Sequence, residues 1–471
     1  MTRIGAQLLL TALLAIGSAR AQAPSGTIAG VVTDPSGTPI AGARVRLANR
    51  DSGLTRSLTT SAEGDYSVAA LPPGVYHLTA EAEGFGLLER TATVETGTTT
   101  TLNLTLRVGE LNEQVTVDMA APLIQYDHHQ VGGLVSREQI ENLPLNGRNF
   151  LELAKLEPGV ANPITSGNRT FVPVLGTGIF NPPRIGNTRV TVDGASVVSI
   201  GTIGTALQLS QEIVQEFQLS TVNFDLSTSL TSNGSINIVT RSGGKDFHGS
   251  VFYFYRDHNL AAYPGLGRDA NNPDPFFQRN QFGFHVGGPI KRDRVFFFTG
   301  YERNDQRGVL SVQPRTPEFA SLGGVFSSPF LGDQFNLRLD ARLLPDHNAF
   351  ARYTHHKNNS FGGGGNALPS GWSRSESWTD QSMTGLTRVL SSNIVNDLRI
   401  SYFITSEAGT PASAEDCQGC LGVGAPSINI PNAGVTLGNA RRASSVGRRY
   451  QLTDSLVWLN GILRFRFGLY W

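Results

Sequence analysis

From residue 249 onward, apolar and polar residues alternate with a period of two. In the segment 334–342, alternate residues form one apolar set, Phe335, Leu337, Leu339 and Ala341, and one polar set, Asn336, Arg338, Asp340 and Arg342. Successive side chains of a strand point to opposite faces, so this pattern predicts strands with one apolar and one charged face. Nine segments follow it, near 249–256, 279–289, 294–303, 333–342, 347–357, 378–389, 394–404, 449–458 and 462–471.

Short and long connections alternate between these nine segments. Tight turns are expected at 291–293, 344–346, 391–393 and 460–461, and long loops at 257–278, 304–332, 358–377 and 405–448. Membrane barrels have this arrangement, with lipid on the apolar face and a wet lumen on the other. Backbone groups in lipid must be paired, so such a sheet has to close on itself. The pattern therefore predicts a transmembrane antiparallel β-barrel rather than a soluble sandwich.

The strand number suggests that this barrel is incomplete. Nine strands would form a ring too narrow for a domain of about 130 residues, because barrel diameter grows with strand number. We therefore expect a fragment of a longer product, with a natural short form as the alternative.

The N-terminus has the three parts of a secretory signal peptide. Arg3 supplies the positive charge, residues 8–16 form an apolar run, and Ala19-Arg20-Ala21 is a small-x-small cleavage site. Residues 1–21 are therefore expected to be removed, leaving Gln22 at the mature N-terminus.

Residues 22–108 contain short strands separated by turns. Asp34-Pro35-Ser36-Gly37 and Glu63-Gly64-Asp65 are turn sequences, and the last strand is expected over 99–106. Turn signals every 8–12 residues favour a β-sandwich, here of seven strands.

Residues 109–245 mix helix and strand signals. Ser136 with Gln139 three residues later forms a capping box before an apolar face, which predicts a helix over 136–143. A strand near 188–192 ends in the turn pair Asp193-Gly194. A further strand over 235–240 follows Asn233-Gly234.

The first of these domains resembles the carboxypeptidase regulatory-like domain, which has a transthyretin-like fold. The resemblance lies in Gly30-Val31-Val32-Thr33-Asp34, in Pro39-Ile40-Ala41-Gly42-Ala43, and in Gly64-Asp65-Tyr66 with Leu71-Pro72-Pro73-Gly74. It implies glycan contact, while a structural spacer or docking module is the alternative that we favour. Peptidase activity is not expected, because the sequence has no His-Glu-x-x-His zinc motif.

The second domain resembles the plug of TonB-dependent outer-membrane receptors. The strand with Asp193 and Gly194, and the strand from Gly234 through Asn237 to Thr240, carry this likeness. Leu143-Pro144-Leu145-Asn146-Gly147-Arg148-Asn149 is similar to the Oar-like branch. In that family a TonB box precedes the plug, and the corresponding residues here are Glu113, Gln114, Val115, Thr116 and Val117. From the residues alone, this extended stretch is a β-augmentation segment, a last sandwich strand or a linker.

Composition and side-chain chemistry exclude several functions. Lys plus Arg equals Asp plus Glu, at 38 each, so the chain lacks the basic excess of a nucleic-acid-binding protein. No nucleophile elbow, phosphate-binding loop or metal-ligand spacing is found, so we expect no enzyme activity, metal or cofactor. Cys417 and Cys420 are expected to pair as a disulfide in an extracytoplasmic loop. The pairs His128-His129 and His355-His356 lack metal-ligand spacing, and His355 and His356, at a strand-to-loop border, are interpreted as surface or rim residues.

The sequence thus predicts a mainly β protein of the Gram-negative outer membrane. The expected order is signal peptide (1–21), regulatory-like sandwich (22–108), TonB box and plug (109–245), and part of a barrel (246–471). The resemblance implies energy-coupled uptake with a TonB-type inner-membrane partner, the sandwich and TonB box being periplasmic. Outer-membrane lipid and a carbohydrate, peptide or protein substrate are the other implied partners. The alternative is a surface adhesin that transports nothing.

Overall fold

The computed structural model describes residues 25–109, 115–117, 130–143, 145–156, 189–199, 205–223 and 234–470. The last range has gaps at 264–267, 269–271, 345, 364–366, 392, 418–419, 440 and 461–462. The expected signal peptide and His128-His129 lie outside the described residues.

The N-terminal domain is a β-sandwich of two sheets. One sheet has the order β4-β1-β7, with β8 also paired to β1, and the other has the order β3-β2-β5-β6-β9. Apolar side chains from both sheets, such as Ile28, Leu47 and Leu78, are buried between them. The strands are β1 (Gly26–Thr33), β2 (Arg44–Asn49), β3 (Thr55–Thr59), β4 (Asp65–Leu71), β5 (Gly74–Glu81), β6 (Leu88–Val94), β7 (Thr99–Thr101), β8 (Leu104–Thr105) and β9 (Val115–Val117).

The sandwich differs from the predicted seven strands at its end. The segment 99–106, predicted as one strand, is divided into β7 and β8. Between them the side chain of Asn103 accepts the hydrogen bond of the Val31 N–H at 3.1 Å, replacing a backbone partner. β9 then adds a further strand to the second sheet.

The plug domain is built on a five-stranded sheet in the order β10-β13-β14-β11-β12. The predicted capping box is present, with Ser136 and Gln139 bonding each other's backbone N–H at the start of α2. The strands are β10 (Gln130–Val135), β11 (Arg189–Val192), β12 (Ala195–Ser196), β13 (Val214–Asn223) and β14 (Ser235–Thr240). The helical segments are α2 (Arg137–Asn142), η1 (Asn146–Arg148), η2 (Phe150–Leu156) and η3 (Gln211–Ile213).

Nine long antiparallel strands follow one another in a single sheet, as predicted. Their order is β15-β16-β17-β19-β20-β21-β22-β25-β26, with the short β18 (Gly324–Ser327) paired to β17. The nine are β15 (His248–Asp257), β16 (Phe277–Lys291), β17 (Val295–Val312), β19 (Phe330–Leu344), β20 (His347–Gly362), β21 (Ser373–Ser391), β22 (Ile394–Pro411), β25 (Ala443–Asn460) and β26 (Leu463–Tyr470). Among the described residues, no helix has the length and apolar composition needed to cross a membrane.

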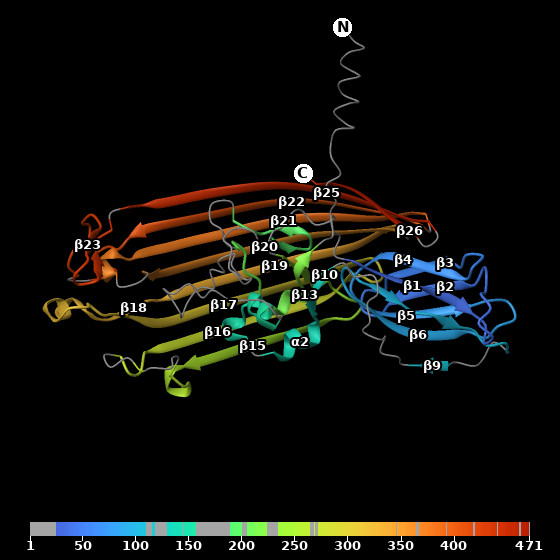
Figure 1. Cartoon of the computed structure of the whole chain (residues 1–471), viewed down its shortest axis with the longest axis horizontal. Coiled ribbons are helices and arrows are strands. Elements are labelled where there is room, and N and C mark those ends of the chain that lie inside the picture. Colours follow the sequence, from blue (N-terminus) through green and yellow to red (C-terminus); the bar gives the residue numbers. More distant parts are fainter. Residues whose placement is uncertain are drawn as a thin grey trace, which may run out of the picture.

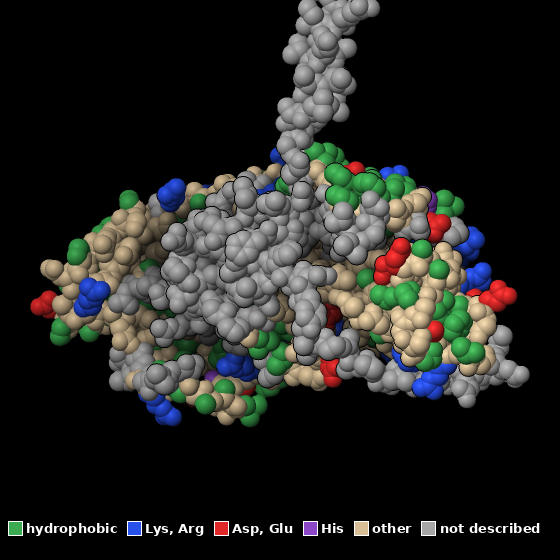
Figure 2. Space-filling view, turned by 45° about the vertical axis from the view of Figure 1, so that its right-hand side comes forward, with side chains coloured by type: hydrophobic (Ala, Val, Ile, Leu, Met, Phe, Trp, Pro, Cys, Tyr) green, Lys and Arg blue, Asp and Glu red, His purple; other side chains and the backbone are tan. Residues whose placement is uncertain are grey.

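The two ends of this sheet differ. At the turn end, consecutive strands are joined by a few residues; at the loop end, long connections carry η4 (His258–Leu260), η5 (Pro317–Leu322), η6 (Pro369–Gly371), β23 (Ile428–Ile430) and β24 (Val435–Leu437). The sandwich lies at the turn end, on the right of Figure 1, and the β18 and β23 loops lie at the opposite end. Charged side chains of both signs are scattered over the sandwich surface in the space-filling view (Figure 2).

The predicted alternation sets the two faces of the sheet. Gln281, Glu302, Asn336 and Gln381 are buried on the inner face, which contacts the plug, whereas Phe282, Leu339 and Ile400 are exposed on the outer face. The interpretation of His356 as a rim residue is wrong. β20 continues to Gly362, five residues past the predicted strand end, so His356 lies within the strand and is 4% exposed on the inner face.

Candidate functional site

The first contact between plug and barrel is centred on Asp193. Asp193 and Gly194 both have positive φ, 51° and 87°, as a two-residue type I′ hairpin turn between β11 and β12 requires. The Asp193 side chain is 1% exposed. The N–H and hydroxyl of Thr240, at the end of β14, donate to its carboxylate at 2.9 and 2.8 Å.

Three arginines from three barrel strands converge on this turn. Nε of Arg352 (β20) lies 2.9 Å from Oδ2 of Asp193, and Nη1 of Arg338 (β19) lies 3.5 Å from Oδ1. Arg399 (β22) donates to the Asp193 carbonyl at 2.6 Å. Burial opposes ionisation of this carboxyl, but the cations and the Thr240 hydrogen bonds together lower the pKa of Asp193. The turn is thereby fixed to the barrel wall in its charged form.

The remaining residues of the predicted plug motif belong to the same sheet. The side chain of Asn237 accepts a hydrogen bond from the Thr191 hydroxyl at 2.9 Å, which joins β14 to β11. Gly234 has φ 106°, a conformation open to glycine, where the chain enters β14. The Gly194 carbonyl accepts from Gln451 of β25 at 3.0 Å. These residues build and anchor the plug sheet.

The second contact is made by Arg148, in the sequence Asn146-Gly147-Arg148. Its Nη2 donates to Glu212 of the plug at 2.6 Å, and its Nε lies 3.5 Å from Glu302 of β17. Its guanidinium also covers the rings of Phe252 and Phe254 on β15, at 4.3 and 4.9 Å from their centres. Arg148 has φ 54°, and the preceding Gly147 has φ 68°. The resemblance pointed to this motif, but its role becomes visible only in the structure.

Glu212 is the common partner of several side chains at this second contact. Arg137 lies 3.2 Å from its carboxylate and Nδ1 of His285, from β16, lies 3.1 Å from it. Burial opposes the charge, but the bonds from His285 and Arg148 and the nearby Arg137 hold the pKa of Glu212 at about 2. The plug is therefore tied to the first barrel strands by buried ion pairs whose separation in an apolar setting is costly.

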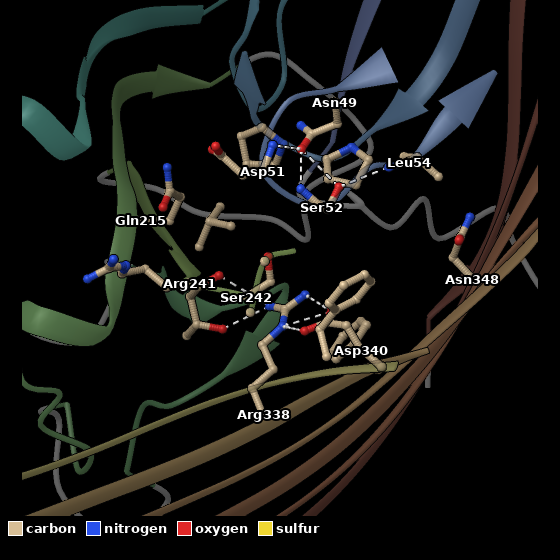
Figure 3. Close-up of a pocket in the computed structure, with 18 of the residues that line it drawn as sticks. Asn49, Asp51, Ser52, Leu54, Gln215, Arg241, Ser242, Arg338, Asp340 and Asn348 are labelled. Atoms are coloured by element: carbon tan, nitrogen blue, oxygen red, sulfur yellow. Dashed lines mark hydrogen bonds and ion pairs between the residues drawn. The ribbon is translucent and has the colours of Figure 1, made fainter. Parts of the chain in front are cut away.

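A chamber of about 720 Å³ lies where sandwich, plug and barrel meet at the turn end. The sandwich contributes the turn from Asn49 to Leu54, the plug contributes Gln215, and the barrel contributes Arg338 and Asp340. Figure 3 shows these side chains on opposite walls of the chamber. The sandwich therefore lies next to the plug at the turn end of the barrel strands.

The predicted TonB-box residues are only partly described. Val115, Thr116 and Val117 form β9, which pairs in parallel with β6 of the sandwich, whereas Glu113 and Gln114 lie outside the described residues. Of the alternatives that the sequence left open, the backbone pairing is that of a last sandwich strand.

The loops at the far end of the barrel share a hydrophobic core. Its buried members come from three separate connections and include Val312, Trp372 and Val435. Trp372 is 1% exposed, and its indole N–H donates to the Ala367 carbonyl at 2.7 Å. Cys417 and Cys420 are bonded as a disulfide in the connection between β22 and β25. The loops thus form an ordered cap.

Comparison with known proteins agrees with this architecture. Residues 27–107 match the carboxypeptidase regulatory-like domain family, and residues 239–331 and 327–471 match the outer membrane beta barrel domain family. The sandwich, plug and barrel strands are similar in fold to those of TonB-dependent outer-membrane receptors, and the barrel-domain match supports a location in the outer membrane.

The TonB-dependent transporter Oar of Myxococcus xanthus is a curated relative. It is 31% identical over 307 residues, which cover 62% of this chain and 28% of Oar. Among solved structures, the outer membrane transporter YddB from Escherichia coli has a TM-score of 0.53 at 12% identity. The siderophore receptor PirA from Acinetobacter baumannii has a TM-score of 0.50 at 16% identity. Each alignment covers 72% of this chain and 47% of the solved one, so this chain spans less than half of either.

Proposed function

We propose that the chain carries out the gating and energy-coupling steps of uptake across the outer membrane. The observation that carries this proposal is the attachment of the plug to the inner face of the barrel at two buried centres. At the first, Asp193 pairs with Arg352; at the second, Glu212 contacts His285 and Arg148 contacts Glu302. A plug held in this way closes the lumen at rest, and work is needed to shift it. The relatives with this architecture are transporters and receptors, not enzymes.

In the proposed mechanism, a TonB-type inner-membrane protein supplies that work through residues 113–117. Those residues precede β10, which pairs with plug strand β13, so a pull on them acts on the plug sheet. Substrate would bind at the loop-end cap and the plug. The sandwich, at the opposite end, would then be periplasmic.

Deletion of residues 113–117 tests the proposal. Surface binding should persist and uptake should stop, and collapse of the proton gradient should stop uptake by the undeleted protein to the same extent. Uptake that survives both treatments would refute energy coupling. A deletion of five residues in the undescribed stretch 157–188 that leaves 113–117 intact controls for general damage.

A surface adhesin is the second candidate, and the ordered cap favours it. The cap has its own core around Trp372, so a preformed outer surface is available for a glycan or a protein. Adhesion would not depend on the proton gradient, whereas uptake would, so collapse of the gradient separates the two functions.

A further inference from the structure

The strand β9 occupies the edge of the sandwich sheet. Its backbone pairs in parallel with β6, in the register Leu88 with Val115, Glu89 with Thr116 and Arg90 with Val117. Three residue pairs make a weak attachment, and parallel pairing is slightly less stable than antiparallel pairing. The strand is therefore held at rest but can be exchanged for a better partner.

The strand that holds β9 is also bonded to the plug. Two residues beyond the end of β6, the N–H and hydroxyl of Thr96 donate to the carboxylate of Glu216 on β13, at 3.1 and 2.8 Å. Gln218, also on β13, donates to the Thr96 carbonyl at 3.1 Å. Glu216 is 5% exposed and Thr96 is 2% exposed, so water is excluded from this contact. A shift of β13 would break hydrogen bonds to the turn that directly follows β6, the strand that carries β9.

Two further bonds fix the turn between β2 and β3 of the sandwich. Arg342, on barrel strand β19, donates to the Gly53 carbonyl at 2.7 Å, and the Lys245 N–H donates to the Asp51 carbonyl at 2.9 Å. The sandwich is thus seated on the plug and on the barrel at once. Its orientation, and with it the position of β9, depends on both.

We propose that the regulatory-like sandwich is a clamp that withholds the coupling strand β9 and releases it when the plug moves. A partner that recognises 113–117 by strand addition competes with β6 for β9. While Thr96 is bonded to Glu216 and Gln218, β6 is held rigid and β9 stays paired. When β13 shifts, β6 loses this support and β9 becomes available. The proposal rests on the proposed function and gives the sandwich its part in it.

A disulfide lock tests the clamp. The double variant Glu89→Cys with Thr116→Cys joins two paired positions of β6 and β9. The double variant Arg46→Cys with Ser57→Cys, at paired positions of β2 and β3, is the matched control lock in the same sheet. The probe is the purified C-terminal periplasmic domain of the host's TonB-type protein, titrated against the full chain in detergent micelles.

The β6–β9 lock should weaken binding of this probe at least tenfold relative to the control lock, and reduction should restore binding. Equal binding by the two oxidised locks would overturn the clamp, since the partner would then be adding to the free edge of the docked strand. If the probe binds neither the unmodified chain nor the reduced variants, the proposed TonB coupling itself fails.

The release of β9 through the plug contact can be tested without the TonB-type protein. Thr96→Val removes the hydroxyl donor to Glu216 and keeps the shape of the side chain. Hydrogen exchange of the amides of 115–117 should become several-fold faster in this variant, and stay unchanged in Thr38→Val on an exposed turn of the same sandwich. Unchanged exchange in Thr96→Val would show that the plug contact does not govern β9, and would overturn the release step.

Discussion

Replacing Asp193 with Asn should loosen the plug more than any other single change of one charge in the plug sheet. Asn tolerates a positive φ and can still accept the Thr240 N–H, so the turn itself is preserved. The substitution removes the carboxylate partner of Arg352, a residue that is 2% exposed. Removing one partner of a buried ion pair costs about 3–5 kcal/mol. Arg338 loses less, because it also pairs with Asp340 at 2.9 Å.

Hydrogen exchange of β11 and β14 in detergent measures this effect. A loss of about 3–5 kcal/mol corresponds to a loss of protection of at least about a hundredfold. Asp333→Asn is the control, since Asp333 pairs with Arg303 on the outer face of the barrel, where both side chains are partly exposed. Its effect should stay below about 1 kcal/mol. If Asp193→Asn lowers protection less than threefold, the ionic centre does not hold the plug and the reasoning is refuted.

Three further changes have defined outcomes. Arg148→Lys loses the two-sided contact with Glu212 and Glu302, so the local stability of the plug should fall by about 2 kcal/mol. Faster cleavage of the plug by protease measures this loss. Burial raises the pKa of Glu216 to about 7, above its ordinary value, so this plug carboxyl holds its proton more tightly when the sandwich is docked than when it is undocked. Docking should therefore be strongest at acidic pH and weaken as pH rises through 7, a dependence that Glu216→Gln abolishes in hydrogen exchange of residues 95–97. Trp372→Ala should cost the cap about 3–5 kcal/mol and expose the 412–442 connection to protease.

Each of these three predictions has a result that would contradict it. Arg148→Lys should affect the plug while Arg44→Lys, in an exposed pair with Glu81, does not; equal effects would remove the special role of Arg148. Burial also raises the pKa of the neighbouring Glu95, so a pH dependence that survives in Glu216→Gln would assign the titration to Glu95 instead. Protease resistance of the cap in Trp372→Ala would mean that its loops are ordered independently.

The barrel strands could be predicted from the sequence because lipid and lumen impose opposite requirements on alternate residues. Strand ends were harder to predict. β17 was expected over 294–303 and extends over Val295–Val312, because the added residues continue the backbone pairing with β16 and β19 and then pair with β18. β20 likewise extends past its predicted end, to Gly362, which places His356 inside the strand and not at its border. Local turn signals, such as Asp193-Gly194, were readable because they depend on neighbouring residues alone.

The ionic centres could not be predicted. Arg338, Arg352 and Arg399 are separated by 14 and 47 positions, and only the arrangement of β19, β20 and β22 around the plug brings them to one residue, Asp193. The partner of 115–117 was equally hidden. A short β-prone segment joins whichever sheet edge is free, and sequence does not reveal that the edge is β6.

The most direct test of the central claim is whether energy moves the plug. Ser220 on β13 is 3% exposed, so Ser220→Cys should be protected from a membrane-impermeant maleimide at rest; Cys417 and Cys420 are bonded to each other and do not react. In cells with a proton gradient, we predict labelling of this cysteine that falls to background when the gradient is collapsed or residues 113–117 are deleted. Labelling that is the same in all three conditions would contradict an energy-driven plug.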